Sequence, residues 1–307
     1  MQLEKLRTER RNRATENLDT MQTIDLVAAM NREDMAVPRA IKGALPEIAE
    51  AVDAIARCFA RGGRLIYVGT GTSGRIGALD ASECPPTFGT NPEMVQFLIA
   101  GGERALVRAT EASEDSAELG RRDMAAMKPG KRDAVVGIAA SGRTPYTIAA
   151  LEYARKKGSA TIAIACNRGS ALGKAAQICI EVEVGPEVLA GSTRLKAGTA
   201  QKLICNMLTT GAMVKLGYVY SNLMVNLQLK NEKLVERGIL ILETLANVNR
   251  DAALEVLKEA GMSVPLALVM LKADVSKSEG AKRLRKAKGN VREAIEGLPG
   301  KLRGNLR

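Results

Sequence analysis

The 307-residue sequence predicts an α/β protein whose core is a five-stranded parallel sheet flanked by helices. Short apolar runs alternate with helical segments over the first two thirds of the chain, which is typical of parallel strands joined by right-handed crossovers. Two of these runs end in turns rich in hydroxyl side chains, and parallel sheets bind ligands at the carboxyl ends of their strands. The predicted strands are Leu65–Val68, Val95–Ala100, Ala134–Ile138, Thr161–Ala165 and Ile178–Val182.

Helices are predicted before, between and after the strands. In the segment Pro38–Ala60, apolar residues recur every three or four positions, as they do on the buried face of a helix. A shorter helix is predicted over Thr23–Met30. The remaining predicted helices are Arg75–Leu79, Ala105–Lys128, Pro145–Lys157, Leu172–Ala176 and Thr193–Lys215.

The chain is predicted to have three parts. Residues 1–55 form a polar arm and helices, residues 56–235 form the sheet domain, and residues 240–307 form a small all-helical subdomain. In the last part, the pattern that begins at Leu257 recurs from Leu284, which indicates a weak internal repeat. We expect this subdomain to serve packing or to support a dimer.

Composition excludes several classes of protein. Apolar residues make up 46% of the chain, but no uninterrupted apolar run reaches the ~18 residues that span a bilayer. The amino terminus carries charges where a signal peptide is apolar. The five cysteines are scattered and lack metal-site spacing, so we expect a cytoplasmic protein with no metal, no other cofactor and no membrane partner.

The net charge of +11 raises the question of nucleic-acid binding, because most of the excess lies after Lys272. There is no aromatic residue after Tyr220, so stacking on bases is not available in that part of the chain. The favoured interpretation is a solvated basic surface, and nucleic acid is not an expected partner.

The segment Gly69-Thr-Gly-Thr-Ser-Gly-Arg75 follows the first predicted strand and opens a helix. Unpaired backbone N–H groups and the helix dipole favour an anion at such a place. The segment lacks the lysine of a Walker loop. Its glycines match the dinucleotide spacing, but the acidic residue of that fingerprint is not placed after a second strand. The hydroxyls suit a sugar phosphate better, and the competing interpretation is a tight turn without a ligand.

A second turn of the same kind, Ala139-Ala-Ser-Gly-Arg-Thr144, follows the third predicted strand. Pro145 then suits the first turn of a helix, where its missing N–H would be unpaired in any case. Two strand–turn–helix units that can converge on one ligand are more specific than either unit alone.

The hydroxyl turn Ser141–Thr144 resembles the loop with which sugar isomerase (SIS) domains hold phosphosugars, although Ala139 stands where a serine is usual. Further motifs extend the resemblance, and with them the chain is similar to the N-acetylmuramic acid 6-phosphate etherase family from about Leu18 to about Ala294. Those motifs are Asp80-Ala-Ser-Glu-Cys-Pro-Pro-Thr87, Gly185-Pro-Glu-Val188, Gly191–Lys202 and Asn231-Glu-Lys-Leu234.

This resemblance implies an SIS-type fold, a homodimer and a carbon–oxygen lyase. The implied reaction removes D-lactate from C3 of N-acetylmuramic acid 6-phosphate by elimination and then hydration, leaving N-acetylglucosamine 6-phosphate. Elimination needs a base for the C2 proton and an acid for the leaving oxygen. The chain has no histidine, so carboxylates are the natural candidates.

Glu83 is the candidate acid, because it follows the first turn on a loop expected to be stiffened by Pro85 and Pro86. The competing interpretation is an ordinary surface acid. For the base, Glu114 is one of four acids on a stretch predicted to be helical, and such clusters are usually solvated. Only the family resemblance selects Glu114 among Glu111, Glu114, Asp115 and Glu118.

The other candidate residues are donors or acceptors for the phosphate, the lactyl carboxylate or the sugar hydroxyls. Two alternative functions stay open: an SIS-type aldose–ketose isomerase, and a non-catalytic phosphosugar sensor that binds a partner protein. The candidate substrate-binding residues are Gly71, Thr72, Ser73, Gly74, Arg75, Ser141, Gly142, Arg143, Thr144, Glu187, Ser192 and Lys196.

Overall fold

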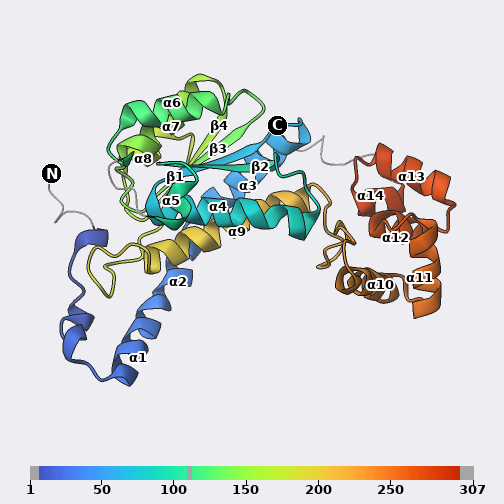
Figure 1. Ribbon diagram of the computed structural model, residues 1–307, viewed down its shortest axis with the longest axis horizontal. Helices are drawn as coiled ribbons and strands as arrows, with labels where there is room; N and C mark the ends of the chain where they lie inside the picture. The colour runs from blue at the N-terminus through green and yellow to red at the C-terminus, as the bar shows by residue number, and fades with distance from the viewer. Residues whose placement is uncertain (1–6, 109–112, 298–307) are drawn as a thin grey trace. The chain divides into compact units, whose positions relative to one another are not determined.

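The five expected strands form one parallel sheet in the computed structural model, which describes residues 7–108 and 113–297 (Figure 1). Each strand begins and ends within one residue of its predicted bounds, so the strand predictions are confirmed. The order in the sheet is β2-β1-β3-β4-β5. The strands are β1 (Leu65–Gly69), β2 (Val95–Ile99), β3 (Ala134–Ala139), β4 (Ala160–Ala165) and β5 (Ile178–Glu181).

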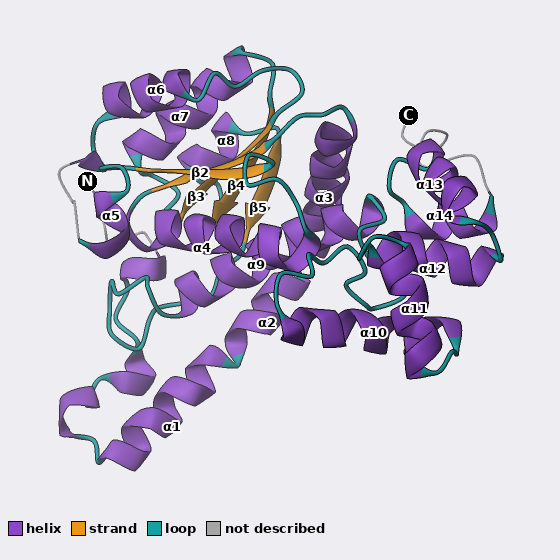
Figure 2. Ribbon diagram, turned by 45° about the vertical axis from the view of Figure 1, so that its right-hand side comes forward, coloured by secondary structure: helices purple, strands orange, loops and turns teal. Residues whose placement is uncertain are grey.

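Helices cover both faces of the sheet (Figure 2). Successive strand side chains point to opposite faces. Ile66 and Val68 therefore pack on one face against α6 (Ala117–Ala126), α7 (Pro145–Lys156) and α8 (Ala171–Ala175). Tyr67 points to the other face, where α3 (Leu45–Ala60) and α4 (Gly71–Phe88) lie. Helix α9 (Lys196–Lys215) runs alongside α4.

The chain divides into two compact units. The first contains the chain up to Ser82 and Pro92–Thr209, with the sheet, α1 (Thr23–Asp34) and α2 (Ala36–Lys42). The second contains Glu83–Asn91 and the chain from Thr210 onward. None of the helices in the described ranges is both long and apolar enough to cross a membrane. The helices of the second unit after α9 are α10 (Glu232–Ala246), α11 (Arg250–Glu259), α12 (Val264–Ala273), α13 (Lys277–Lys286) and α14 (Val291–Glu296).

Helix α4 corrects one sequence prediction. It was expected to end at Leu79, with Pro85 and Pro86 in a loop, but it continues to Phe88 with both prolines inside it. A proline lacks the N–H that would bond the carbonyl four residues earlier, yet its fixed φ suits a helix. The helix instead ends at Phe88, because the next residue, Gly89, has φ of +66°; its N–H donates to the carbonyl of Pro85.

A second correction concerns the helix predicted over Ala105–Lys128. The structure has two helices there, the four-residue α5 (Arg104–Val107) and α6. Ser116 separates them, because its side chain accepts a hydrogen bond from the N–H of Leu119 and so caps the start of α6. The helix predicted over Pro38–Ala60 is likewise divided between α2 and α3, with Gly43 as the residue that ends α2.

The internal repeat in the second unit is confirmed as a repeated helical hairpin. Helix α11 ends with the N–H of Met262 donating to the carbonyl of Leu257, at 2.9 Å. Helix α13 ends with the N–H of Gly289 donating to the carbonyl of Leu284, at 2.8 Å. Both turns pass through left-handed backbone before α12 and α14 begin. The two copies of the sequence repeat therefore have the same turn geometry, one after α11 and one after α13.

An ion pair joins the amino ends of the neighbouring strands β1 and β3. The backbone N–H of Arg64 donates to Oδ1 of Asp133 at 2.9 Å, and Nη2 of Arg64 donates to Oδ2 at 3.0 Å. The N–H of Gly130 also donates to Oδ2. Burial opposes ionisation of this carboxyl, but the hydrogen bonds and charge of Arg64 outweigh it and hold the pKa of Asp133 below its ordinary value.

We expect Asp133→Asn to lower the free energy of unfolding at pH 7 by about 1–3 kcal/mol, because it removes hydrogen bonds to a charged acceptor. The pKa of Asp133 is lower in the folded state, so its contribution is present above the unfolded-state pKa and is lost as the pH falls through the folded-state pKa. The difference between variant and wild type should therefore shrink below about pH 4. Denaturant titrations at neutral and acidic pH measure this difference in the free energy of unfolding. An equal difference at both pH values would contradict the lowered pKa of Asp133.

Candidate functional site

The two hydroxyl-rich turns leave the same edge of the sheet from neighbouring strands. Strands β1 and β3 pair in parallel, with Gly69 opposite Ile138 at their carboxyl ends. Strand β2 pairs with the other side of β1, so the order of the strands reverses between β1 and β3. Open α/β sheets bind ligands at this switch point. The structure thus brings together the two turns that the sequence analysis identified separately.

Two glycines of the first turn are required by its geometry. Gly71 begins α4 with φ of +49°, in the left-handed region that favours glycine. A Cβ on Gly74 would lie 2.6 Å from Cγ1 of Ile99, so only glycine allows α4 to approach β2 this closely. The first turn of a helix leaves its leading N–H groups without partners inside the helix. The turn therefore fits the predicted anion site.

Helix α9 packs against this first turn. Ser73 is buried, and its hydroxyl donates to Oε1 of Gln201 at 3.0 Å. The methyl group of Thr72 lies 3.5 Å from the position of a Cβ on Gly198. Sequence reasoning did not single out Gln201, and its only signal was its place within the Gly191–Lys202 motif.

Glu114 lies between the two turns. Its Oε1 is 3.3 Å from the position that a Cβ on Gly71 would take. Its backbone carbonyl accepts a hydrogen bond from the N–H of Tyr146, in the first turn of α7, at 3.1 Å. Glu114 and Asp115 lie in the turn between α5 and α6 rather than on a helix. Glu111, the other acid considered as an alternative, is outside the described residues.

The second turn is held by its own backbone. Gly142 has φ of +66°, and a Cβ there would lie 2.4 Å from Cβ of Ser170. The hydroxyl of Ser141 accepts from the N–H of Arg143 at 3.2 Å, and the side chain of Arg143 is exposed. Thr144 precedes α7 without capping it through its side chain. These groups are thus placed at the amino end of a helix, as predicted.

Two other candidates, Glu187 and Lys196, are buried in a polar network. The carboxylate of Glu187, 0% exposed, accepts from the N–H groups of Lys196 and Ala197, each at 2.9 Å. Burial raises the pKa of Glu187 against the effect of these donors. Nζ of Lys196 pairs with Glu33 of α1. Both side chains are therefore engaged inside the protein: Glu187 caps the start of α9, and Lys196 joins α9 to α1. Ser192 is half-buried.

Arg75 is also engaged within the protein. Its Nε donates to the carbonyls of Ala105 and Leu106, each at 3.0 Å, and its Nη2 donates to the carbonyl of Arg108 at 3.3 Å. Instead of lying open to solvent beside the first turn, the guanidinium holds the end of α5.

Glu83 is not on a stiffened loop, as the sequence predicted, but inside α4, where it is exposed. It lies beyond Gly71 by about 18 Å along a helix that rises 1.5 Å per residue. Helix α4 therefore does not bring the carboxylate of Glu83 to the first turn of the same chain.

Comparisons with known proteins agree with this architecture. The family model described as "Glucokinase regulatory protein N-terminal SIS domain" matches residues 47–155, and that described as "SIS domain" matches residues 110–211. N-acetylmuramic acid 6-phosphate etherase 2 of Lactiplantibacillus plantarum is 52% identical over 96% of this chain and 100% of its own length. N-acetylmuramic acid 6-phosphate etherase of Clostridium beijerinckii is 48% identical over 98% of this chain and 99% of its own.

Among solved structures, phosphoheptose isomerase from Francisella tularensis is similar, with a TM-score of 0.46 and 19% identity. The match covers 62% of this chain and 100% of that one.

The closeness of Glu114 to Gly71 predicts an energetic coupling between them. Gly71→Ala should destabilise the fold by about 1–3 kcal/mol, because alanine is strained at positive φ. Its methyl group would in addition crowd the Glu114 carboxylate. In a Glu114→Ala background we expect about 0.5–1 kcal/mol of this cost to disappear. Denaturant titration of the single and double variants measures the coupling.

Gly102→Ala is the matched control, because Gly102 also has positive φ but no atom within 4 Å of its Cβ position. Its cost should be the same with or without Glu114→Ala. Equal costs of Gly71→Ala in both backgrounds would show that Glu114 does not lie at this turn.

Proposed function

The chain belongs to the N-acetylmuramic acid 6-phosphate etherase family, and from this premise we propose how its residues carry out the reaction. It is a carbon–oxygen lyase that cleaves the D-lactyl ether of N-acetylmuramic acid 6-phosphate, giving N-acetylglucosamine 6-phosphate and D-lactate. The observation that carries the assignment of the site is that Glu114 lies beside the turn after β1 and is hydrogen-bonded to the helix that follows β3.

The chemistry begins with the open-chain sugar, in which the C2 proton is acidified by the neighbouring aldehyde. A base removes this proton, the electron pair forms a C2–C3 double bond, and the C3–oxygen bond breaks as an acid protonates the departing lactate. Water then adds at C3 and a proton returns to C2, so the two groups exchange roles. Two carboxylates in different environments are sufficient for this sequence.

We assign the base to Glu114, because a phosphosugar held by the two turns would lie against its carboxylate. The phosphate is proposed to bind at the amino end of α7, where Ser141, Arg143 and Thr144 can donate and the helix dipole favours an anion. Contacts of the substrate with Glu187, Ser192 and Lys196 stay predictions. In the turn after β1, the proposed substrate-binding residues are Gly71, Thr72, Ser73 and Gly74. In the turn after β3, Gly142 is proposed as well.

We assign the acid to Glu83 and propose that a second copy of the chain supplies it. The position of Glu83 along α4 does not bring it to the first turn of its own chain. Leu79, one turn earlier on the same face of α4, is 50% exposed, and Met207 on the adjacent α9 is 38% exposed. A symmetric dimer that covers this face would bury these apolar side chains together with Glu83.

We also propose a cytoplasmic setting and a reaction that needs no cofactor. All five cysteines are free thiols, and four of them are buried. Burial raises the pKa of Cys166 to about 12, so this thiol stays protonated at neutral pH. The proposed acid–base steps use carboxylates alone.

Nearly isosteric variants can distinguish the role of the base from the role of the acid. Glu114→Gln should abolish exchange of the C2 proton with solvent deuterium, whereas Glu83→Gln should stop lactate release and leave some C2 exchange. The expected rate loss is about 10²–10⁴-fold, the usual contribution of a positioned acid or base. Lactate release and deuterium incorporation are measured on the phosphorylated substrate, with Glu118→Gln, on the exposed surface of α6, as the control.

The same measurements test the function itself. Wild-type protein should release lactate from the phosphorylated sugar and act poorly on the unphosphorylated one. A ketose product without lactate would indicate an isomerase, and binding without turnover would indicate a phosphosugar sensor. Retained lactate release in both glutamine variants would remove Glu83 and Glu114 from the mechanism.

A shared site predicts complementation between inactive variants. When Glu83→Gln and Glu114→Gln chains are mixed and allowed to exchange subunits, each mixed dimer should hold one site with both native carboxylates. Random assortment makes half of the dimers mixed, so about a quarter of wild-type activity is expected. Each variant alone is the control. If sedimentation or mass spectrometry shows subunit exchange and the mixture stays inactive, both carboxylates of a site belong to one chain.

A further inference from the structure

We infer that Arg75 is a positioning residue for Glu114, which it serves by holding the end of α5. The inference rests on the proposed role of Glu114 as the base. In this role Arg75 does not bind the substrate phosphate. It holds residues 105–108, which precede Glu114 in the sequence.

The contacts of Arg75 are specific to a guanidinium. Nε lies 3.0 Å from both the carbonyl of Ala105 and that of Leu106, and Nη2 lies 3.3 Å from the carbonyl of Arg108. The planar arrangement of donors lets one side chain reach several acceptors at once. A lysine ammonium on a single flexible stem does not reproduce this pattern.

Helix α5 has few interactions of its own that could hold it in place. It is four residues long, and Ala105 is its one buried residue. Val107 is 84% exposed. The last carbonyls of a helix have no donors within it and need partners from elsewhere. Arg75 provides such donors, and a cation at this end also suits the helix dipole.

Helix α4 connects this anchor to the site. Gly71 and Arg75 are four residues apart and share a face of α4. The first lies beside the carboxylate of Glu114 and the second holds the carbonyls at the end of α5. One helix thus holds the carbonyls of residues 105, 106 and 108 through Arg75 and lies beside the carboxylate of Glu114 at Gly71. Loss of the Arg75 contacts should therefore displace the base without removing it.

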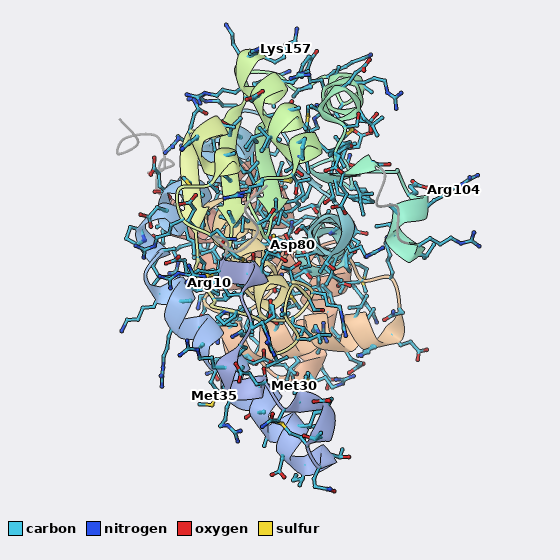
Figure 3. The ribbon with its side chains drawn as sticks, turned by 90° about the vertical axis from the view of Figure 1, so that its left-hand side faces the viewer. Arg10, Met30, Met35, Asp80, Arg104 and Lys157 are labelled. Carbon is cyan, nitrogen blue, oxygen red and sulfur yellow. The ribbon has the colours of Figure 1, made fainter. Side chains whose placement is uncertain are left out.

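The experiment compares Arg75→Met and Arg75→Lys with Arg104→Met in the full-length chain. Arg104 belongs to α5, the helix that Arg75 holds, but its side chain projects away from the protein (Figure 3), so its removal deletes a guanidinium without deleting these contacts. Amide hydrogen exchange over residues 104–108 reports the anchoring directly. Michaelis constants and rates of C2-proton exchange, measured on the phosphorylated sugar, report the base.

For Arg75→Met we expect amide exchange at 104–108 to rise by about 10-fold or more, because local opening becomes easier. C2-proton exchange should fall by about 10- to 100-fold, the effect of a small misplacement of a catalytic group, with KM within about twofold of wild type. For Arg75→Lys we expect amide exchange and C2-proton exchange between the values of wild type and Arg75→Met. If Arg75→Met does not fold, Arg75→Lys is used for the test. Arg104→Met should match wild type throughout.

Unchanged amide exchange at 104–108 would overturn the inference. So would a KM raised by about 10-fold or more with kcat retained, because this is the result expected of a phosphate ligand. The amide measurement needs no substrate, so it tests the anchor even if the wild-type chain releases no lactate and the proposed function fails.

Discussion

The parallel pairing of β1 with β3 is the constraint on which the rest of the site depends. Both strands lie inside the sheet, and the ladder fixes their carboxyl ends at the same level. Each strand must then turn into a helix at the same edge, so α4 and α7 begin beside each other. Glu114 lies at this edge, with its backbone carbonyl bonded to the N–H of Tyr146 in α7 and its carboxylate beside Gly71. A one-residue change of register would separate these groups.

A buried carboxylate fixes the other face of α4. Asp80 accepts hydrogen bonds from Tyr67 of β1 at 2.8 Å, and from Asn206 and Thr209 of α9 at 2.7 and 3.2 Å. Figure 3 labels Asp80 within the body of the protein. Burial raises its pKa even though all three partners favour the charged form. The network joins strand and both helices, so α4 cannot rotate about its axis, and Gly71 and Arg75 keep their orientation.

The sequence was sufficient to predict the sheet, because strands buried on both faces appear as continuous apolar runs. It was also sufficient for the turns, which carry local signals in glycine and hydroxyl residues. It failed where the decisive contact is distant in the chain. The prolines at 85 and 86 locally favour a loop, but α4 continues to Phe88, whose carbonyl accepts a hydrogen bond from the distant Asn226 at 2.8 Å. Nothing near Arg75 in the sequence indicates that its partners lie at Ala105 and Leu106.

Burial supports the choice of Glu114 among the acids of the first unit. Glu187 is fully buried, and each of its carboxylate oxygens accepts from a backbone N–H of α9, so a substrate would have to displace the cap of that helix. Asp80 is committed to three donors. Asp115 and Glu118 are exposed to solvent, where a carboxylate is well hydrated and is not held against a ligand. Glu114 is half-buried at the switch point of the sheet, accessible enough to meet a substrate and enclosed enough to be positioned. Neighbouring acids that the sequence left equivalent are thus separated by their environments, which only the fold defines.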